Sequence, residues 1–81
     1  MWFVYILQCE DGSLYTGSTN DLDRRFTAHK EGRGARYTKS HPVTACVYSE
    51  SCGTRGNALR REAEIKKLSR TKKLELIEMS A

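Results

Sequence analysis

The sequence predicts one small domain of the α/β class that combines a β-hairpin, a third strand and three helices. Three observations support this class. An apolar N-terminal run is followed by a turn signal and a second strand-like run. Residues typical of helix N-caps and glycines typical of helix C-termini then mark the ends of several polar segments. A length of 81 residues fits a single domain, spanning residues 1–81, with a modest core.

The hairpin comes first. Trp2 to Gln8 is continuously apolar and rich in aromatic and β-branched residues, and at this length it is typical of a buried strand. Leu14 to Thr19 is the expected return strand, because the segment Glu10 to Ser13 between them has the composition of a turn.

The length of this turn decides where two tyrosines lie. A two-residue turn at Asp11-Gly12 would put Tyr5 and Tyr15 on opposite faces of the sheet. A three-residue loop with Gly12 in the left-handed conformation instead pairs Tyr5 with Gly17 and puts both tyrosines on one face, roughly 7–8 Å apart. We favour the three-residue loop because a lone glycine in its third place is typical of that turn. Gly17 opposite Tyr5 would then leave open space over the tyrosine ring.

The first helix is expected from about Asp21, where a short side-chain oxygen can accept a free backbone N–H. Leu22 and Phe26 are four residues apart and would face the core. We expect the helix to end near Gly32 or Gly34, either of which can take the left-handed cap conformation.

The remaining elements follow from strand composition and helix caps. We expect a basic loop over Arg33–Pro42, a strand over Val43–Ser49, a loop over Glu50–Gly56, a helix from Ala58 to about Leu68 capped by Asn57, and a short helix through Ile77 capped by Ser69 or Thr71.

Cationic and donor groups gather around the first helix. Arg25 and His29 are four residues apart and share one helix face, beside the apolar one. With Tyr15 and Gly17 just before the helix, they form the edge of a cationic pocket. Such a pocket suits an anionic substrate, for example a phosphodiester.

Glu62 is the second informative position. It is spaced three or four residues from Ala58 and Ile65, so it lies on or at the edge of a buried helix face, where an unpaired carboxylate is costly. Two interpretations stay open. Glu62 is either a buried salt-bridge partner, for which Arg25 is the obvious candidate, or a functional carboxylate such as a metal ligand.

The charge is basic and uneven. Lysine and arginine total 14 against 10 acidic residues, a formal net charge of +4. A basic patch is the electrostatic footprint of nucleic-acid binding, although a solvated helix face gives the same pattern. Most of the excess falls in the C-terminal third, at Arg55, Arg60, Arg61, Lys66, Lys67, Arg70, Lys72 and Lys73.

The three cysteines, Cys9, Cys46 and Cys52, contain no C-x-x-C pair and fit neither a zinc site nor a disulfide framework. We expect reduced thiols and a cytoplasmic protein. The apolar run at Trp2–Leu7 is too short to span a membrane and has no basic lead-in, so we expect no signal peptide.

Four motifs together resemble the GIY-YIG nuclease superfamily. They are Val4-Tyr5-Ile6, Tyr15-Thr16-Gly17, Arg25-x-x-x-His29 and Ala58-Leu59-x-x-Glu62. The resemblance covers essentially the whole chain and is greatest to the small, free-standing, single-domain bacterial type. The stretch from Gly34 to Lys39 also resembles a loop of the branch of the superfamily that cuts branched DNA.

The resemblance implies a three-stranded antiparallel sheet flanked by helices, and an endonuclease that hydrolyses phosphodiester bonds. Glu62 would bind one Mg²⁺ or Mn²⁺ ion, and Arg25 would hold the scissile phosphate. Tyr5, Tyr15 or His29 would activate the water, and the three alternatives stay open. An unperturbed histidine titrates near pH 6.5 and needs no help at neutral pH, whereas a tyrosine does.

The implied partner is nucleic acid, with DNA, branched or single-stranded, expected rather than RNA, and with DNA repair as the setting. A homodimer or a protein partner would supply targeting. The alternative is a nucleic-acid-binding module with little or no catalysis, in which Tyr37 stacks on a base. The expected nucleic-acid-binding residues are Gly17, Arg24, Arg36, Tyr37, Thr38, Lys39, Arg61 and Lys66.

Overall fold

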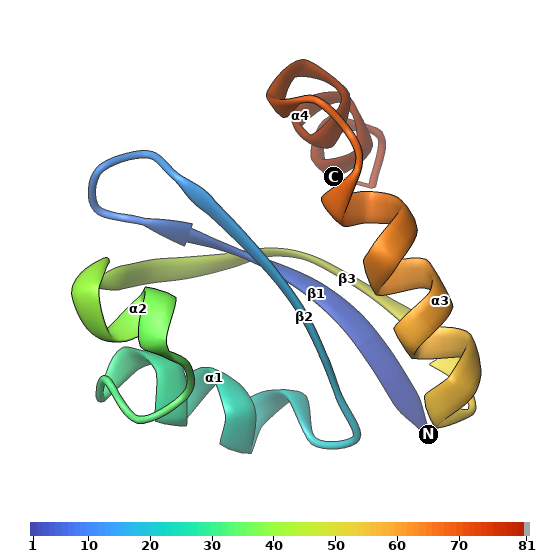
Figure 1. The fold of residues 1–81 in the computed structure, drawn as a ribbon, viewed down its shortest axis with the longest axis horizontal. Coiled ribbons are helices and arrows are strands. Elements are labelled where there is room, and N and C mark those ends of the chain that lie inside the picture. Colours follow the sequence, from blue (N-terminus) through green and yellow to red (C-terminus); the bar gives the residue numbers. More distant parts are fainter. Residues whose placement is uncertain (81) are drawn as a thin grey trace.

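The computed structural model describes residues 1–80 and contains one three-stranded antiparallel sheet with helices on both faces (Figure 1). The strands are β1 (Trp2–Cys9), β2 (Leu14–Thr19) and β3 (Val43–Gly53), in the order β2-β1-β3. The helices are α1 (Leu22–Lys30), α2 (Arg36–Ser40), α3 (Arg55–Lys66) and α4 (Arg70–Met79). This architecture confirms the predicted fold class.

The β1–β2 hairpin has the three-residue loop that the sequence favoured. Gly12 is left-handed, with φ of 84°, and the Cys9 N–H donates to the Ser13 carbonyl at 2.9 Å. Tyr5 therefore pairs with Gly17, and both tyrosines project to the same face of the sheet.

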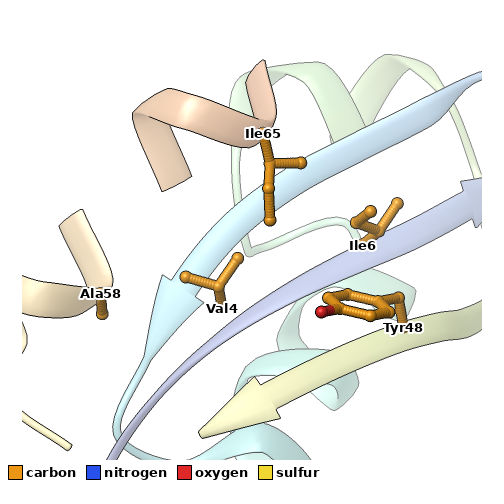
Figure 2. Packing of buried hydrophobic residues seen from close by; sticks show 5 residues of the cluster. All are labelled: Val4, Ile6, Tyr48, Ala58 and Ile65. Atoms are coloured by element: carbon orange, nitrogen blue, oxygen red, sulfur yellow. The ribbon is translucent and has the colours of Figure 1, made fainter. Parts of the chain in front are cut away.

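Alternation along β1 divides the core into two layers. Val4 and Ile6 project toward α3, where they pack with Tyr48, Ala58 and Ile65 (Figure 2). The residues between and after them project to the other face, where Tyr5, Leu7, Cys9 and Val43 form a second cluster with Tyr15, Leu22 and Phe26. Helices α1 and α2 cover this second face (Figure 1).

Helix α1 begins as predicted. The Asp21 side chain caps it by accepting the Arg24 N–H at 3.1 Å. Gly32, with φ of 77°, supplies the left-handed residue just beyond its end.

The stretch predicted as a continuous loop over Arg33–Pro42 contains the short helix α2. Helix α2 itself, Arg36–Ser40, contains no glycine or proline, and the Lys39 N–H donates to the Ala35 carbonyl at 3.0 Å. The sequence prediction was wrong here because a basic, glycine-flanked segment has the composition of a loop, whereas packing of Thr38 stabilises a helical turn.

Strand β3 extends beyond its predicted end, and helix α3 begins earlier than predicted and ends at Lys66 rather than near Leu68. Strand β3 continues to Gly53, where a loop from Glu50 was predicted, because its second half pairs with the start of β1. The 11 residues of β3 run alongside the 8 of β1, so only part of β3 pairs residue for residue, and register irregularities absorb the difference. Helix α3 begins at Arg55, and its cap is Thr54, which accepts the Asn57 N–H at 3.2 Å. Asn57 was predicted as that cap, but its side-chain amide donates to the Cys52 carbonyl instead.

Helix α4 is capped by Ser69, one of the two predicted alternatives, and continues two residues beyond the predicted Ile77. Leu76 and Ile77 anchor it to the α3-side core. None of the four described helices is long and apolar enough to cross a membrane.

The α3-side core gives a stability prediction. Ile65 is 0% exposed, whereas Leu59 on the same helix is 44% exposed. Ile65→Ala is expected to lower the free energy of unfolding by about 2–5 kcal/mol, because it removes buried methyl groups and leaves a cavity. Leu59→Ala is the matched control, with a change of roughly 0.5 kcal/mol. Urea unfolding of both variants measures the difference, and equal losses would contradict the assignment of this core.

Candidate active site

The candidate residues meet at β2, an edge strand of the sheet. Successive side chains along a strand point to opposite faces. Tyr15 and Gly17 therefore lie on the α1 side, with Tyr5, whereas Ser18 lies on the α3 side, where its hydroxyl contacts Glu62. The site thus has two halves, one on each face of the same strand.

A buried tyrosine–histidine pair forms the first half. The Tyr5 hydroxyl lies 2.8 Å from Nε2 of His29, and the histidine is only 1% exposed. The Tyr15 ring also contacts His29, with the ring centroids 5.1 Å apart. The predicted convergence of these three residues is therefore present in the structure.

Gly17 has a packing role that differs from the prediction. A Cβ at this position would overlap the Tyr5 hydroxyl, so the tyrosine ring fills the space that the sequence interpretation left open. Glycine is required here because two strands and a tyrosine ring approach one another closely.

Arg25 lies near the same pair. Its Nη2 donates to the Gly34 carbonyl at 2.8 Å, and its guanidinium is close enough to the Tyr5 hydroxyl to lower the pKa of that group. Burial raises the pKa of Tyr5 to about 12, and the opposing effect of Arg25 is smaller. Arg25 makes no ion pair with Glu62 among residues 1–80, so the proposed Arg25–Glu62 salt bridge was wrong.

His29 titrates differently from the prediction. Burial, together with the positive charge of Arg25, lowers the pKa of His29 to about 4. The expectation of an unperturbed histidine was wrong, because the ring is sealed between β1, β2 and α2. His29 is therefore neutral at pH 7.

Thr38 belongs inside the site. It was predicted to contact nucleic acid, but its side chain is 2% exposed, and its Oγ1 lies 2.7 Å from Nδ1 of His29. The alternating burial of a short helix explains the difference, because Thr38 faces inward while its neighbours Tyr37 and Lys39 face solvent.

Glu62 forms the second half of the site. Its side chain is 18% exposed, and Ser18 donates to its Oε1 at 2.7 Å while the Lys66 ammonium pairs with Oε2 at 2.7 Å. Although Glu62 lies across the sheet, its negative charge contributes to raising the pKa of Tyr5. Burial remains the main cause of that raised pKa.

The donor set around Glu62 fits a weakly held Mg²⁺ or Mn²⁺ ion. Residues 1–80 contain no cluster of three or more histidine, cysteine or acidic side chains that would form a protein cage for a metal. Magnesium does not need one, because it is commonly bound through one or two carboxylates, with water and phosphate oxygens completing the shell. A single oriented carboxylate with a hydroxyl beside it satisfies that requirement.

An arginine-lined cleft opens beside Arg25. Its volume is about 540 Å³, and Arg24 and Arg33 contribute two further guanidinium groups. The remaining lining comes from Thr19, Asn20, Asp21 and Ala28. The cleft is suited to phosphate groups next to the one that Arg25 would hold.

The exposed side of α2 carries Arg36, Tyr37 and Lys39, as expected of a nucleic-acid contact. The Tyr37 ring stacks on His41 with centroids 4.0 Å apart and planes 3° apart, and it also stacks with Tyr15 with centroids 5.8 Å apart, so its ring is engaged within the protein. Arg61, another predicted contact, pairs with Glu50 and Glu64 instead, so its guanidinium is largely engaged within the protein.

Sequence reasoning missed two residues of this site. Ser18 directly follows the second tyrosine motif, and strand alternation could have assigned it to the face opposite Tyr15. Arg33 lies within a predicted loop, and no sequence signal indicates that it lines the same cleft as Arg24.

The fold and this constellation define a GIY-YIG protein, and comparison with known families agrees. The model of the GIY-YIG catalytic domain matches residues 1–75, so the chain belongs to the GIY-YIG family. Its relatives include small bacterial proteins called UPF0213 proteins. One from Staphylococcus saprophyticus is 49% identical over 75 residues, covering 93% of this chain and 92% of the relative. One from Desulfotalea psychrophila is 50% identical over 80 residues, covering 98% of this chain and 73% of the relative.

A solved structure extends the comparison to three dimensions. The solution NMR structure of the UPF0213 protein from Bacillus halodurans has a TM-score of 0.61 and 44% sequence identity. The match covers 98% of this chain and 85% of that one. Membership of the family supports a nuclease-type function, and the relatives' names specify no substrate.

The buried histidine predicts a pH dependence of stability. The pKa of His29 is about 4 when folded and 6.5 when unperturbed, so the unfolded chain binds the proton more tightly. The stabilisation is present above pH 6.5 and is lost as the pH falls toward 4, up to about 3 kcal/mol. Urea unfolding between pH 7 and 4, with NMR titration of the imidazole, measures both quantities.

His41→Gln is the control for this titration, because the chain has only two histidines. The variant should keep the full pH dependence. A His29 imidazole that titrates near pH 6.5 in the folded protein would contradict the buried pair.

Proposed function

We propose that this chain is a divalent-metal-dependent endonuclease that hydrolyses phosphodiester bonds of DNA in branched or single-stranded form. The observation that carries the proposal is the convergence of Tyr5, His29 and Arg25 on one face of β2 with Glu62 on the other. A buried proton-transfer pair, a phosphate-binding cation and an oriented carboxylate together fit phosphodiester hydrolysis.

Arg25 is the candidate group for the scissile phosphate. Its guanidinium is half-buried, and one Nη2 hydrogen bond to Gly34 fixes its orientation. The remaining N–H groups would face the phosphate oxygens and offset the charge that develops on them. Arg24 and Arg33 in the adjoining cleft would bind neighbouring phosphates.

Tyr5 and His29 would act as one unit in activating water. A tyrosine with a pKa of about 12 is almost entirely protonated at neutral pH, so it cannot act as a preformed phenolate. In the proposed step, a water proton passes to the Tyr5 oxygen while the Tyr5 proton passes to His29 Nε2. The water oxygen bonds to phosphorus as the bond from phosphorus to the leaving sugar oxygen breaks, and that oxygen takes a proton from solvent water. His29, whose pKa is about 4, would then return its proton through Tyr5 to solvent. The half-buried Tyr15 would flank the phosphate.

Glu62 would hold the metal ion, and Ser18 would orient the carboxylate through Oε1. When bound, the ion supplies Lewis-acid stabilisation of the charged phosphate oxygens. Glu62 is the candidate because it is the carboxylate that lies at β2 and acts electrostatically on Tyr5.

A second candidate function is a nucleic-acid-binding module without cleavage. The ion pair between Lys66 and Glu62 favours it, because an ammonium group occupies a carboxylate oxygen that a metal ion would need. The exposed basic groups of α2 and the arginine-lined cleft serve either function. The two functions differ in whether Glu62 and a divalent metal matter.

A cleavage assay at low salt separates the two functions. Labelled single-stranded, duplex and branched DNA and an RNA hairpin are incubated with Mg²⁺, Mn²⁺ or EDTA. Cleavage that requires metal supports the nuclease, and the preferred substrate identifies its class. Salt-sensitive binding of these nucleic acids with no cleavage would overturn the nuclease proposal in favour of the binding module.

Glu62→Gln is expected to reduce cleavage by about 100-fold or more while binding of the nucleic acid persists, because the neutral amide is a poor metal ligand. Single-turnover cleavage and fluorescence anisotropy measure the two effects. Glu64→Gln on the same helix is the control. Glu64 is exposed, so this variant should cleave normally. Undiminished cleavage by Glu62→Gln would remove Glu62 from the metal role.

Arg25→Ala is expected to reduce cleavage by about 100-fold or more, because it removes the cation from the reacting phosphate. Its melting temperature should fall only modestly, since one partly buried hydrogen bond to Gly34 is lost. Arg60→Ala on the exposed side of α3 is the control. A large drop in melting temperature together with normal cleavage by the folded fraction would assign Arg25 a purely structural role.

A further inference from the structure

We infer that Thr38 is a positioning residue whose hydroxyl holds His29 in the one tautomer that can accept the proton of Tyr5. The inference deepens the proposed function and rests on it for the catalytic consequence. The tautomer itself is a property of the folded chain and needs no substrate. Thr38 approaches from α2, and Tyr5 approaches from β1 on the other side of the imidazole ring.

The hydrogen bonds around Thr38 have a single consistent direction. Its Oγ1 lies 3.2 Å from the Ala35 carbonyl and 2.7 Å from Nδ1 of His29. A carbonyl can only accept, so the contact between Thr38 and Ala35 is a hydrogen bond only when the Thr38 hydroxyl hydrogen points to that carbonyl. In this arrangement the Thr38 oxygen accepts, and Nδ1 of His29 carries the hydrogen that it receives.

The other ring nitrogen is therefore left as an acceptor. In a neutral imidazole one nitrogen is a donor and the other an acceptor, and burial keeps His29 neutral. Nε2 then accepts from the Tyr5 hydroxyl across 2.8 Å. The opposite tautomer would direct an N–H at the Tyr5 oxygen, which Arg25 also approaches, and would leave the Tyr5 hydrogen without its acceptor.

Gly34 explains why the segment from Gly34 to Thr38 can pack tightly against the His29 ring. A Cβ at Gly34 would overlap the His29 imidazole, so only glycine allows this approach. The carbonyl of the same residue accepts from Arg25. One short segment, Gly34 to Thr38, therefore orients both the proton acceptor and the phosphate-binding cation.

The proposed consequence is that proton transfer depends on a side chain that never touches the substrate. Thr38 is 2% exposed and lies behind His29 as seen from Tyr5. Loss of its hydroxyl would free the ring to take either tautomer, and the fraction with an acceptor at Nε2 would fall.

The test compares Thr38→Val, which keeps the branched shape without the hydroxyl, with Thr38→Ser, which keeps the hydroxyl. Long-range ¹⁵N–¹H NMR reports which ring nitrogen of His29 carries hydrogen, and His41→Gln assigns the signals. The parent and Thr38→Ser should show hydrogen on Nδ1, and Thr38→Val should show a mixture or the opposite tautomer. Thr27→Val, at an exposed threonine of α1, is the matched control and should behave as the parent.

The cleavage rate supplies the second readout. Thr38→Val is expected to lose at least about tenfold in single-turnover rate, and Thr38→Ser to recover to within about threefold of the parent. Hydrogen on Nε2 in the parent, or an unchanged tautomer in Thr38→Val, overturns the inference. If Thr38→Val does not fold, the parent spectrum alone decides the tautomer. If no chain cleaves any substrate, the proposed function fails while the tautomer result still decides the role of Thr38.

Discussion

The hydrogen bond between the Tyr5 hydroxyl and His29 is the interaction on which the rest of this structure depends. It joins the central strand β1 to helix α1 across 2.8 Å of buried space. Two polar groups buried in this way are costly unless each is satisfied, and an unmet partner costs about 1–3 kcal/mol. The surroundings serve that requirement: Gly17 makes room for the tyrosine ring, Thr38 satisfies the far side of the imidazole, and Arg25 contacts the phenol oxygen. The candidate site and a constraint on folding are therefore the same group of contacts.

The edge strand β2 connects this buried pair with the carboxylate on the opposite face. Because side chains alternate along a strand, neighbouring residues supply Gly17 to one face and Ser18 to the other. Arg25 and the candidate metal ligand Glu62 are thus separated by the sheet rather than paired with each other. That separation keeps Arg25 from neutralising Glu62. In the protein alone, Lys66 pairs with Glu62 instead, and its ammonium lies 2.7 Å from the carboxylate.

Much of the fold and half of the site could be predicted from local patterns. The lone glycine of the hairpin loop set the register that puts Tyr5 and Tyr15 on one face, and the Asp21 cap set the phase of α1.

The features that could not be predicted depend on contacts between residues that are distant in sequence. The segment from Arg36 to Ser40 is helical because Thr38 is packed against His29, and composition alone suggested a loop. The second half of β3 is a strand because β1 supplies its partner, although its residues have weak strand propensity. The prediction of Arg25 as the partner of Glu62 was wrong for the same reason. Helix periodicity indicates which face of the helix carries a residue, but not which residue lies opposite that face.

By itself, the sequence determined the order of the three strands and of helices α1, α3 and α4, the pairing within the hairpin and the residues of the GIY-YIG motifs. These follow from short-range periodicity, turn chemistry and motif spacing. Only the tertiary structure decided the state of those residues. It buried His29 and lowered its pKa to about 4, filled the space over Gly17 with the Tyr5 ring, and turned Thr38 from a surface residue into a hydrogen-bond partner of the imidazole. The physical reason is that burial and hydrogen bonding are set by groups brought together from β1, α1 and α2, and no local stretch of the chain contains that information.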